Sequence, residues 1–411
     1  MIRGFRERLD ANVSFGFEHC CGFVRTRVQS NIPFNKPFIT GKELDYISGL
    51  IAEGRLSADG YYTRRCSQLL EERFGIMKVL MTSSCTAALE MAVMLCELEP
   101  GDEVILPSFT FVSTANAVVR AGAKPVFVDI RADTLNIDET LIERSITPRT
   151  RALFPVHYAG VACDMRAINS IAEKHKLLVI EDAAQGVNAF YDGRVLGSLG
   201  HLGAFSFHDT KNYVAGEGGA LCINSPEYIE RAEIIREKGT NRNRFLRGEV
   251  DKYTWVDVGS SFIPPEIACA FLLAQLEAID EITARRREVY EFYRENLAPL
   301  EERELLTMSR IPGDCRSNYH IFFVLLEDPE TRDGLMAHLK QNGISAVFHY
   351  IPLHSSEMGK KFGYQAEDLP LTEDLSARLL RLPLFPDITR DEQMRVVNCI
   401  ADYVGRQRHS V

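Results

Sequence analysis

The chain has 411 residues, a length that predicts two domains, and its 45% hydrophobic and 25% charged residues are typical of a folded globular protein. The formal net charge of −10 argues against nucleic acid as a partner, because binding a phosphate backbone requires a basic face. No apolar run approaches the roughly 20 residues of a membrane-spanning helix, so we expect no membrane association. Ten cysteines without a C-x-x-C pair or zinc-type spacing predict no metal site and favour a reducing, cytoplasmic setting.

Residues 1–30 differ in pattern from the rest of the chain. They mix arginines with phenylalanines, lack an apolar stretch of signal-peptide length and carry acidic residues that do not suit a transit peptide. We expect a poorly ordered extension there. Helical spacing of apolar residues then predicts helices over 41–54 and 61–74.

A short apolar run that begins at Val79 meets the hydroxyl residues Ser84 and Thr86 before a helix predicted over 87–95. Small hydroxyl residues are preferred helix caps. The free N–H groups and the positive end of the helix dipole would also suit a phosphate. Both interpretations, a simple capped helix and an anion site, stay open at this point.

Strands alternate with helices over the next hundred residues. The pattern predicts strands at 103–106, 125–129, 152–156 and 177–181, with helices at 112–121 and 165–175. This order is typical of an α/β fold with a mainly parallel central sheet and helices on both faces.

Ligands of such sheets bind beyond the carboxyl ends of the strands. The candidate residues at those ends are Phe109, His157, Asp182 and Gln185. Each has a simpler interpretation: Phe109 as core, His157 as a satisfied polar group, and Asp182 as a helix cap.

Residues 203–224 predict a strand, a tight glycine-rich turn and a second strand, with Lys211 in the turn. The turn contains Gly216, Gly218 and Gly219. A lysine confined beside polar groups loses its proton readily, which suits Schiff-base chemistry. The alternative is an ordinary surface lysine in a hairpin turn.

The rest of the chain predicts a basic stretch and a smaller α/β unit. The basic stretch, 236–252, is either a solvated loop or a contact for a diphosphate. Helices are predicted over 263–282, 285–297, 331–342 and 391–404, and strands over 320–326 and 344–348. We divide the chain into the extension 1–30, a large domain 31–284, whose first helices could pack on the small domain, and a small C-terminal domain 285–411.

One ligand satisfies all of these sites. It needs a phosphate for the helix start at Ser84–Thr86, a flat ring for Phe109, a carbonyl carbon for Lys211 and a basic ring nitrogen for Asp182. Pyridoxal 5′-phosphate has each of these groups. Lys211 would hold it covalently and, once an amino substrate displaces the lysine, would transfer the proton.

Five segments resemble the DegT/DnrJ/EryC1/StrS family of PLP-dependent nucleotide-sugar aminotransferases. They are SCTAAL at 84–89, PSFTF at 107–111, PVHYAG at 155–160, EDAAQ at 181–185 and FSFHDTKN at 205–212. The resemblance covers about residues 31 to 405. It implies the fold-type I aminotransferase architecture, and transfer of an amino group from L-glutamate to a nucleotide-ketosugar, a dTDP-4-keto-6-deoxyhexose.

The resemblance also implies a role for each site residue. Lys211 would form the Schiff base, Asp182 would pair with the pyridine nitrogen, Gln185 with the ring hydroxyl, and Phe109 would stack on the ring. The phosphate would be held by Ser84, Cys85, Thr86 and Ser206. His157 is a further catalytic candidate, and Arg242, His349 and Tyr350 are candidate substrate contacts.

Members of this family are typically homodimers with shared active sites, in which Ser261 would reach the partner's phosphate. Two positions depart from the common family pattern: Cys85 stands where many members have Gly, and Ser261 where many have Asn. The phosphate contact of the Cys85 amide would be preserved, because it does not involve the side chain. The side chain of Ser261 is shorter than Asn, so its contact with the partner's phosphate stays open.

Three rival functions remain at this stage. A PLP-dependent sugar dehydratase of the same family would typically carry His where Lys211 stands. A non-enzymatic PLP-binding regulator would need a basic DNA-binding module, and a decayed structural paralogue would not retain Lys211, Asp182, Gln185 and Ser206 together. The nucleotide, the configuration of the new amine and the choice between C3 and C4 stay open.

Overall fold

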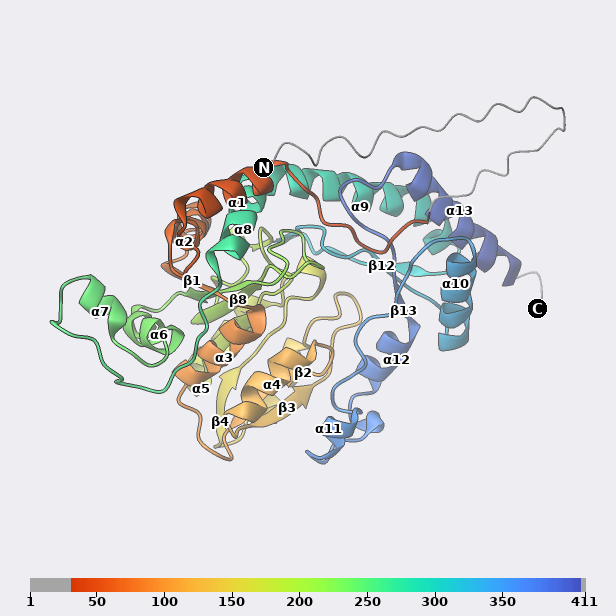
Figure 1. The fold of residues 1–411 in the computed structure, drawn as a ribbon. Coiled ribbons are helices and arrows are strands. Elements are labelled where there is room, and N and C mark those ends of the chain that lie inside the picture. The colour runs from red at the N-terminus through yellow and green to blue at the C-terminus, as the bar shows by residue number, and fades with distance from the viewer. Residues whose placement is uncertain (1–30, 408–411) are drawn as a thin grey trace, which may run out of the picture. The chain divides into compact units, whose positions relative to one another are not determined.

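The computed structural model describes residues 31–407, and the extension expected over residues 1–30 lies outside them. Its centre is a seven-stranded sheet of order β1-β9-β8-β5-β4-β2-β3 (Figure 1). The strands are β1 Lys78–Thr82, β2 Glu103–Pro107, β3 Lys124–Val128, β4 Thr150–Leu153, β5 Leu178–Asp182, β8 Leu202–Ser206 and β9 Gly219–Ile223. From β3 to β8 all neighbours are parallel, whereas β9 and β1 pair antiparallel at one edge. The predicted mainly parallel sheet is confirmed.

Helices cover both faces of this sheet because successive strand residues point into two different cores. Val179 and Phe205 belong to one apolar cluster, and their neighbours Ile180 and Ala204 belong to the other. The first cluster includes residues of α2 (Tyr61–Phe74), α5 (Met165–His175) and α8 (Glu266–Glu277), and the second includes residues of α3 (Cys85–Leu95), α4 (Val112–Arg120) and α6 (Ile229–Arg236).

The first two helices pack on α8 rather than on the C-terminal part, which corrects the alternative left open for them. α1 (Lys42–Glu53) and α2 both contact α8. The buried carboxylate of Glu266, at the start of α8, accepts hydrogen bonds from the amides of Tyr62 and Thr63 at the start of α2. An extended segment reaches the C-terminal part instead: Ile32 bridges to Ile344, and Phe34 O accepts from the amide of Leu384.

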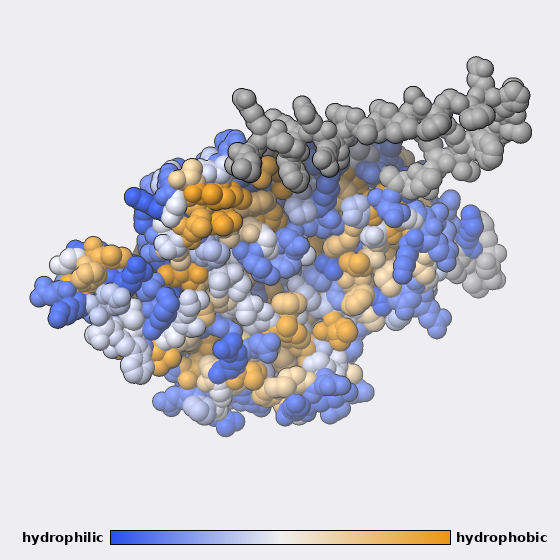
Figure 2. All heavy atoms as spheres, viewed as in Figure 1, coloured by the Kyte–Doolittle hydropathy of each residue, from blue (hydrophilic) through white to orange (hydrophobic). Residues whose placement is uncertain are grey.

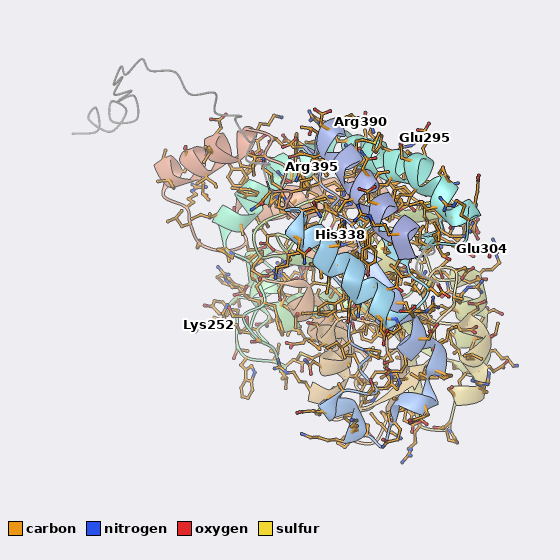
Figure 3. All side chains as sticks on the ribbon, turned by 90° about the vertical axis from the view of Figure 1, so that its right-hand side faces the viewer. Lys252, Glu295, Glu304, His338, Arg390 and Arg395 are labelled. Carbon is orange, nitrogen blue, oxygen red and sulfur yellow. The ribbon has the colours of Figure 1, made fainter. Side chains whose placement is uncertain are left out.

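The C-terminal part contains a three-stranded antiparallel sheet of order β10-β12-β13, packed under helices. Its elements are α9 Ile279–Glu302, β10 Thr307–Met308, β12 Phe323–Leu325, α10 Pro329–Gln341, α11 Glu357–Lys360, α12 Pro370–Arg378, β13 Leu379–Arg381 and α13 Arg390–Gln407. Figure 3 shows α13, which carries Arg390 and Arg395, beside α9 with Glu295 and α10 with His338. A third small sheet joins β11 (Cys315–Arg316), β6 (Phe190–Tyr191) and β7 (Arg194–Val195).

The boundary expected between residues 284 and 285 lies within the continuous helix α9 and remains a prediction. One expectation for this part needs correction. The strand expected over 344–348 does not form, and only single bridges from Ile344 and Val347 remain. The chain leaves β13 after Val347 and carries His349 and Tyr350 into a cavity. The division into a large and a small domain otherwise remains a prediction.

No helix within residues 31–407 is long and apolar enough to cross a bilayer. Several apolar side chains are nevertheless exposed over α1 and near α7 (Arg242–Leu246), where Figure 2 shows hydrophobic residues at the surface. They include Leu44, Ile51, Leu246, Trp255 and Val258.

The hairpin predicted around Lys211 is confirmed, since β8 and β9 pair with Ser206 opposite Gly219. Gly216 has φ +79°, a conformation that L side chains rarely adopt. Gly219 is required for a different reason. A Cβ at this position would lie 2.4 Å from Cys85 N and 2.4 Å from Ser84 C, so only glycine lets the start of α3 rest on β9.

We predict that Gly219→Ala destabilises the protein by about 3 kcal/mol, because the added methyl group meets backbone that cannot rotate away. The free energy of unfolding from urea titration measures this. Gly405→Ala is the matched control: Gly405 lies inside α13 with open space around it, so alanine there should be neutral or stabilising by about 0.5–1 kcal/mol. Equal effects of the two substitutions would contradict the close approach at Gly219.

Candidate active site

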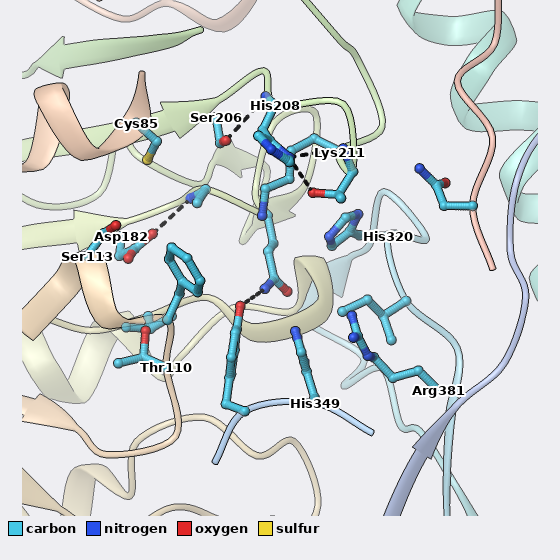
Figure 4. A pocket seen from close by; sticks show the side chains of 18 of the residues that line it. Cys85, Thr110, Ser113, Asp182, Ser206, His208, Lys211, His320, His349 and Arg381 are labelled. Carbon is cyan, nitrogen blue, oxygen red and sulfur yellow. Dashed lines mark hydrogen bonds between the residues drawn. The ribbon is translucent and has the colours of Figure 1, made fainter. Parts of the chain in front are cut away.

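A cavity of about 690 Å³ lies at the carboxyl ends of the parallel strands (Figure 4). The large part contributes the β1–α3 turn, the last residues of β5 and β8 and the turn that carries Lys211. The C-terminal part contributes His320, His349, Tyr350 and Arg381. The cavity therefore joins residues that are up to 350 positions apart in the sequence, since its lining runs from Phe34 to Leu384.

The start of α3 agrees with both interpretations drawn from the sequence, a capped helix and an anion site. Ser84 caps the helix, since its Oγ accepts from Ala87 N at 3.1 Å. The first helical bond runs from Ala88 N to Ser84 O, so the amides of Cys85 and Thr86 precede it and have no intrahelical acceptor. Both residues line the cavity together with Ser206. Two free amides at the positive end of the helix form a site for an anion.

Asp182 and Gln185 both line the cavity in fixed orientations. The Asp182 carboxylate is 5% exposed and accepts from the Thr114 hydroxyl at 2.7 Å and from Ala184 N at 3.1 Å. Gln185 donates from Nε2 to the Tyr350 hydroxyl at 2.9 Å, and its Oε1 accepts from Ala159 N at 2.6 Å. Each side chain is thus held by hydrogen bonds before a ligand arrives.

Lys211 reaches into the same cavity from the turn after β8, where its amide donates to His208 O at 2.9 Å. Burial lowers the pKa of Lys211, while the nearby carboxylate of Asp182 acts in the opposite direction. Desolvation therefore favours the neutral amine, the form that attacks a carbonyl carbon.

Two histidines from the C-terminal part complete the wall. His320 shares a 2.8 Å hydrogen bond with Asn212 Oδ1, and His349 stacks on Tyr350 with 3.7 Å between ring centroids and shares a 2.7 Å bond with the Tyr158 hydroxyl. Burial, reinforced by nearby cations, holds the pKa of both imidazoles well below their usual range. Both rings are therefore neutral at physiological pH.

The structure corrects the aromatic residue chosen from the PSFTF motif. Phe109 is 1% exposed, packs against Tyr158 and Tyr350 at 5.1 and 5.5 Å between ring centroids, and does not line the cavity. Phe111, two residues later at the N-cap of α4, is 56% exposed and does line it. The two phenylalanines are two positions apart in one motif, so spacing alone could not distinguish them.

His157 is also placed differently from the sequence expectation. It is fully buried, with Nε2 2.8 Å from Glu181 Oε2, and its Nδ1 accepts from Cys163 N at 3.2 Å. Both ring nitrogens are satisfied inside the protein, and His157 does not line the cavity. The simpler interpretation of a satisfied polar group therefore replaces the catalytic one.

Arg242 and Ser261 lie outside the cavity of their own chain. Arg242 begins α7 with its guanidinium 3.4 Å from Glu237, and Ser261 is exposed in a bridge with the same glutamate. Other cations of the basic stretch have acidic partners too, namely Arg236 with Asp59, Arg244 with Glu230 and Arg247 with Glu233. The positive charge of this stretch is therefore largely neutralised within the chain.

Several residues of the site were not predicted from the sequence. They are Thr114, Phe111, His320 and Arg381. Phe111 belonged to a quoted motif and could have been found by weighing both aromatic positions. The other three depend on contacts between distant segments.

Comparison with known proteins agrees with this site. The family model described as DegT/DnrJ/EryC1/StrS aminotransferase family matches residues 37–401. The spore coat polysaccharide biosynthesis protein SpsC of Bacillus subtilis is 33% identical over 381 residues, covering 91% of this chain and 97% of SpsC.

Two solved structures share the fold over most of both chains. The Spr1654 aminotransferase of Streptococcus pneumoniae in its PLP form has a TM-score of 0.85 and 25% identity, covering 92% of this chain and 99% of that one. DesV of S. venezuelae, in complex with a ketimine intermediate, has a TM-score of 0.83 and 30% identity, covering 91% and 99%.

Fold and site together define a PLP-dependent aminotransferase of fold-type I. The chain belongs to the DegT/DnrJ/EryC1/StrS aminotransferase family. Pyridoxal 5′-phosphate is its cofactor, and the cavity has the groups to receive it: two amides free for a phosphate, a buried carboxylate for a ring nitrogen and a lysine biased toward the neutral amine.

We predict opposite outcomes for the two phenylalanines of the motif. Phe111→Ala should weaken cofactor binding about tenfold, because an aromatic contact contributes on the order of 1 kcal/mol, and should leave the cofactor-free protein equally stable. Phe109→Ala should cost about 3–5 kcal/mol of stability by leaving a core cavity. Cofactor titration by absorbance and urea unfolding measure the two quantities. Weaker cofactor binding in Phe109→Ala and lower stability in Phe111→Ala would instead assign the stacking role to Phe109.

We also predict that Lys211 in the cofactor-free protein reacts with amine reagents at a lower pH than an ordinary lysine. Because burial lowers its pKa, the neutral, nucleophilic fraction grows at lower pH, and the labelling midpoint should fall below the usual lysine value of about 10.4. Mass spectrometry of samples pulse-labelled across a pH series locates the midpoint. A midpoint at or above the usual value would contradict the desolvation argument.

Proposed function

We propose that the protein transfers the amino group of L-glutamate to a nucleotide-linked ketosugar. The observation that carries the proposal is the convergence of Lys211, Asp182, Gln185 and the free amides of α3 on one cavity. The sugar class is supported by the likeness to SpsC, whose name places it in spore coat polysaccharide biosynthesis, and by the resemblance of the site motifs.

The cofactor-holding roles follow from the donors and acceptors present. The amides of Cys85 and Thr86, with Ser84 and Ser206 beside them, would hold the phosphate. Asp182 would pair with the pyridine nitrogen and keep it protonated, Gln185 would bond to the ring hydroxyl, and Phe111 would pack on the ring. When bound, the protonated cofactor supplies an electron sink for the carbon that loses a proton.

Lys211 is the residue that moves the proton. As a neutral amine it would hold the cofactor covalently, and once the donor has displaced it, it would accept the proton of the donor's Cα and pass it on to the cofactor. In the acceptor half-reaction the same amine would move a proton in the reverse sense, from the cofactor to the sugar carbon that gains the amino group. Neutral His320 and His349 keep extra positive charge away from this amine, which preserves its basicity.

For the acceptor we propose a dTDP-4-keto-6-deoxyhexose, converted into dTDP-4-amino-4,6-dideoxygalactose for a cell-surface polysaccharide such as enterobacterial common antigen or lipopolysaccharide O-antigen. This is the activity of dTDP-4-amino-4,6-dideoxygalactose transaminase. Three segments that resemble the sequence of that transaminase support the proposal: KGTNR at 238–242, VDKYTWVDVGSS at 250–261 and AVFHYIPLH at 346–354. The last segment brings His349 and Tyr350 to the cavity wall. Amination at C3, or of another nucleotide-ketosugar, is the alternative.

We further propose a homodimer in which Arg242 and Ser261 serve the partner's site. Both lie outside the cavity of their own chain, and exposed apolar residues such as Leu246, Trp255 and Val258 surround them in sequence. Apolar surface of this kind is typical of a permanent interface. A protein that sediments as a monomer in analytical ultracentrifugation and is fully active would contradict this proposal.

The rival functions fit the site less well. A dehydratase would lack the lysine that Lys211 provides. A DNA-binding regulator is disfavoured by the net charge of −10.

We predict that Lys211→Ala and Lys211→Arg both abolish turnover, because neither side chain can hold the cofactor covalently and transfer the proton. The assay incubates the enzyme with L-glutamate and a panel of nucleotide-ketosugars, and NMR of the product reports donor, position and configuration together. Lys42→Ala, which removes a surface lysine paired with Glu277, is the control. Substantial amino sugar from the alanine variant would contradict the mechanism, and product at C3 would select the alternative acceptor.

A further inference from the structure

A second pocket, of about 670 Å³, lies beside the segment that carries His320. Tyr319 lines this pocket, whereas the next residue, His320, lines the active-site cavity. On α9, Arg287 and Arg286 divide between the two spaces in the same way, and no described residue lines both. The second pocket is therefore a separate site, and the proposed reaction uses none of its residues.

Two arginines of this pocket have no acidic partner within residues 31–407. Arg287 is exposed and forms no hydrogen bond or ion pair in that part of the chain, and the guanidinium of Arg316 lies over the Phe190 ring at 3.8 Å from the centroid. Among the described residues that line the pocket, the only carboxylate is that of Asp280, which pairs with Arg73. The pocket thus keeps a positive charge that an incoming anion can neutralise.

Both unpaired arginines act on the same phenol. Burial raises the pKa of Tyr319, with a smaller contribution from Glu291, whereas the charges of Arg287 and Arg316 act in the opposite direction. The Tyr319 hydroxyl forms no hydrogen bond with another described residue, so it adds a neutral donor to the two cations. Guanidinium groups and a hydroxyl donor suit the several acceptor oxygens of a phosphate.

Two buried polar side chains of the pocket wall have unused hydrogen-bonding capacity. Asn188 is 7% exposed and donates from Nδ2 to Thr283 Oγ1 at 2.9 Å, but no donor within residues 31–407 reaches its Oδ1. Ser317 is 3% exposed, and its Oγ accepts from Tyr319 N at 3.0 Å, while its own proton has no acceptor among the described residues. A free acceptor and a free donor suit a ligand hydroxyl group, which can donate and accept.

Hydrogen bonds join the segments that carry these two side chains. Asn318 Nδ2 donates to the carbonyls of Gln185 and Val187, both at 2.8 Å. These bonds tie the turn that ends at Asn188 to the segment that begins at Ser317. The pocket wall is therefore organised before a ligand binds, which lowers the entropic cost of binding.

We propose that this pocket binds a phosphate ester of a sugar, with the phosphate on Arg287 and Arg316 and a sugar hydroxyl group on Asn188 and Ser317. A phosphate without a hydroxyl-bearing group would leave the Asn188 oxygen unpaired, and a neutral sugar would leave both arginines without an anion. A free sugar phosphate and a nucleotide-linked sugar share the required chemistry. The site lies outside the active-site cavity and does not depend on the proposed reaction.

The test is calorimetry at low salt with the PLP holoenzyme, so that free phosphate groups do not bind where the cofactor does. Arg287→Met and Arg316→Met should each weaken the binding of a sugar phosphate ester about tenfold, because each removes charge-assisted hydrogen bonds. Arg294→Met is the matched control. Arg294 is exposed on the same helix, has no ion pair within residues 31–407 and does not line the pocket, so its loss should leave the affinity unchanged.

Three probes define the ligand. Methyl phosphate has the charge but no hydroxyl group on its carbon, so sugar esters should bind at least fivefold more tightly, and Ser317→Ala should reduce this preference without weakening methyl phosphate. Loss of glucose 1-phosphate binding in the arginine variants shows that a free sugar phosphate suffices. Loss of dTDP-glucose binding alone assigns the site to a nucleotide-linked sugar.

Two results would overturn the proposal. In one, neither arginine substitution changes the affinity for glucose 1-phosphate or dTDP-glucose, which would place any binding outside this pocket. In the other, both sugar esters bind no more tightly than methyl phosphate, which would remove the role of Asn188 and Ser317. Neither result bears on transamination, which the assay of the Lys211 variants tests separately.

Discussion

The contact between the start of α3 and Gly219 of β9 is the constraint on which the site depends. Because Gly219 has no Cβ, the backbone of Ser84 and Cys85 lies directly against the strand, and the first free amides of the helix face the cavity. The same hairpin carries Lys211 in its turn. One close approach therefore fixes the distance between the anion-binding end of the cavity and the lysine, and the other groups are arranged around these two.

Hydrogen bonds orient the polar groups of the cavity, and burial sets the charges of its basic groups. On the large part, Asp182 and Gln185 are oriented by hydrogen bonds from Thr114, Ala184 and Ala159, so their acceptors and donors need no rearrangement. On the C-terminal part, burial keeps the imidazoles neutral and leaves Arg381 as a cation without an acidic partner in the described chain. A protein with a net charge of −10 thus holds a cavity rich in basic groups, which favours an anionic cofactor.

Transamination requires one cavity to accept two unlike substrates in turn. In the proposed mechanism, groups near Lys211 act in both half-reactions, since the amine must take and return a proton. Arg242 and Ser261 lie outside the cavity of their own chain, and apolar residues near α7 are exposed, which is why we propose that a second chain completes the site.

The sequence by itself determined the mainly parallel α/β sheet and, through its motifs, the residues Lys211, Asp182 and Gln185 and the helix start at Ser84. These follow from local rules: residues at the carboxyl ends of parallel strands converge, and small hydroxyl residues begin helices. Only the tertiary structure decided that Phe111 rather than Phe109 lines the cavity, that His157 is enclosed by Glu181 and Cys163, and that Arg381 lines the same cavity as Lys211. Whether a side chain points into a cavity or into the core depends on which distant segment packs against it, and the periodicity of one strand or helix does not contain that information.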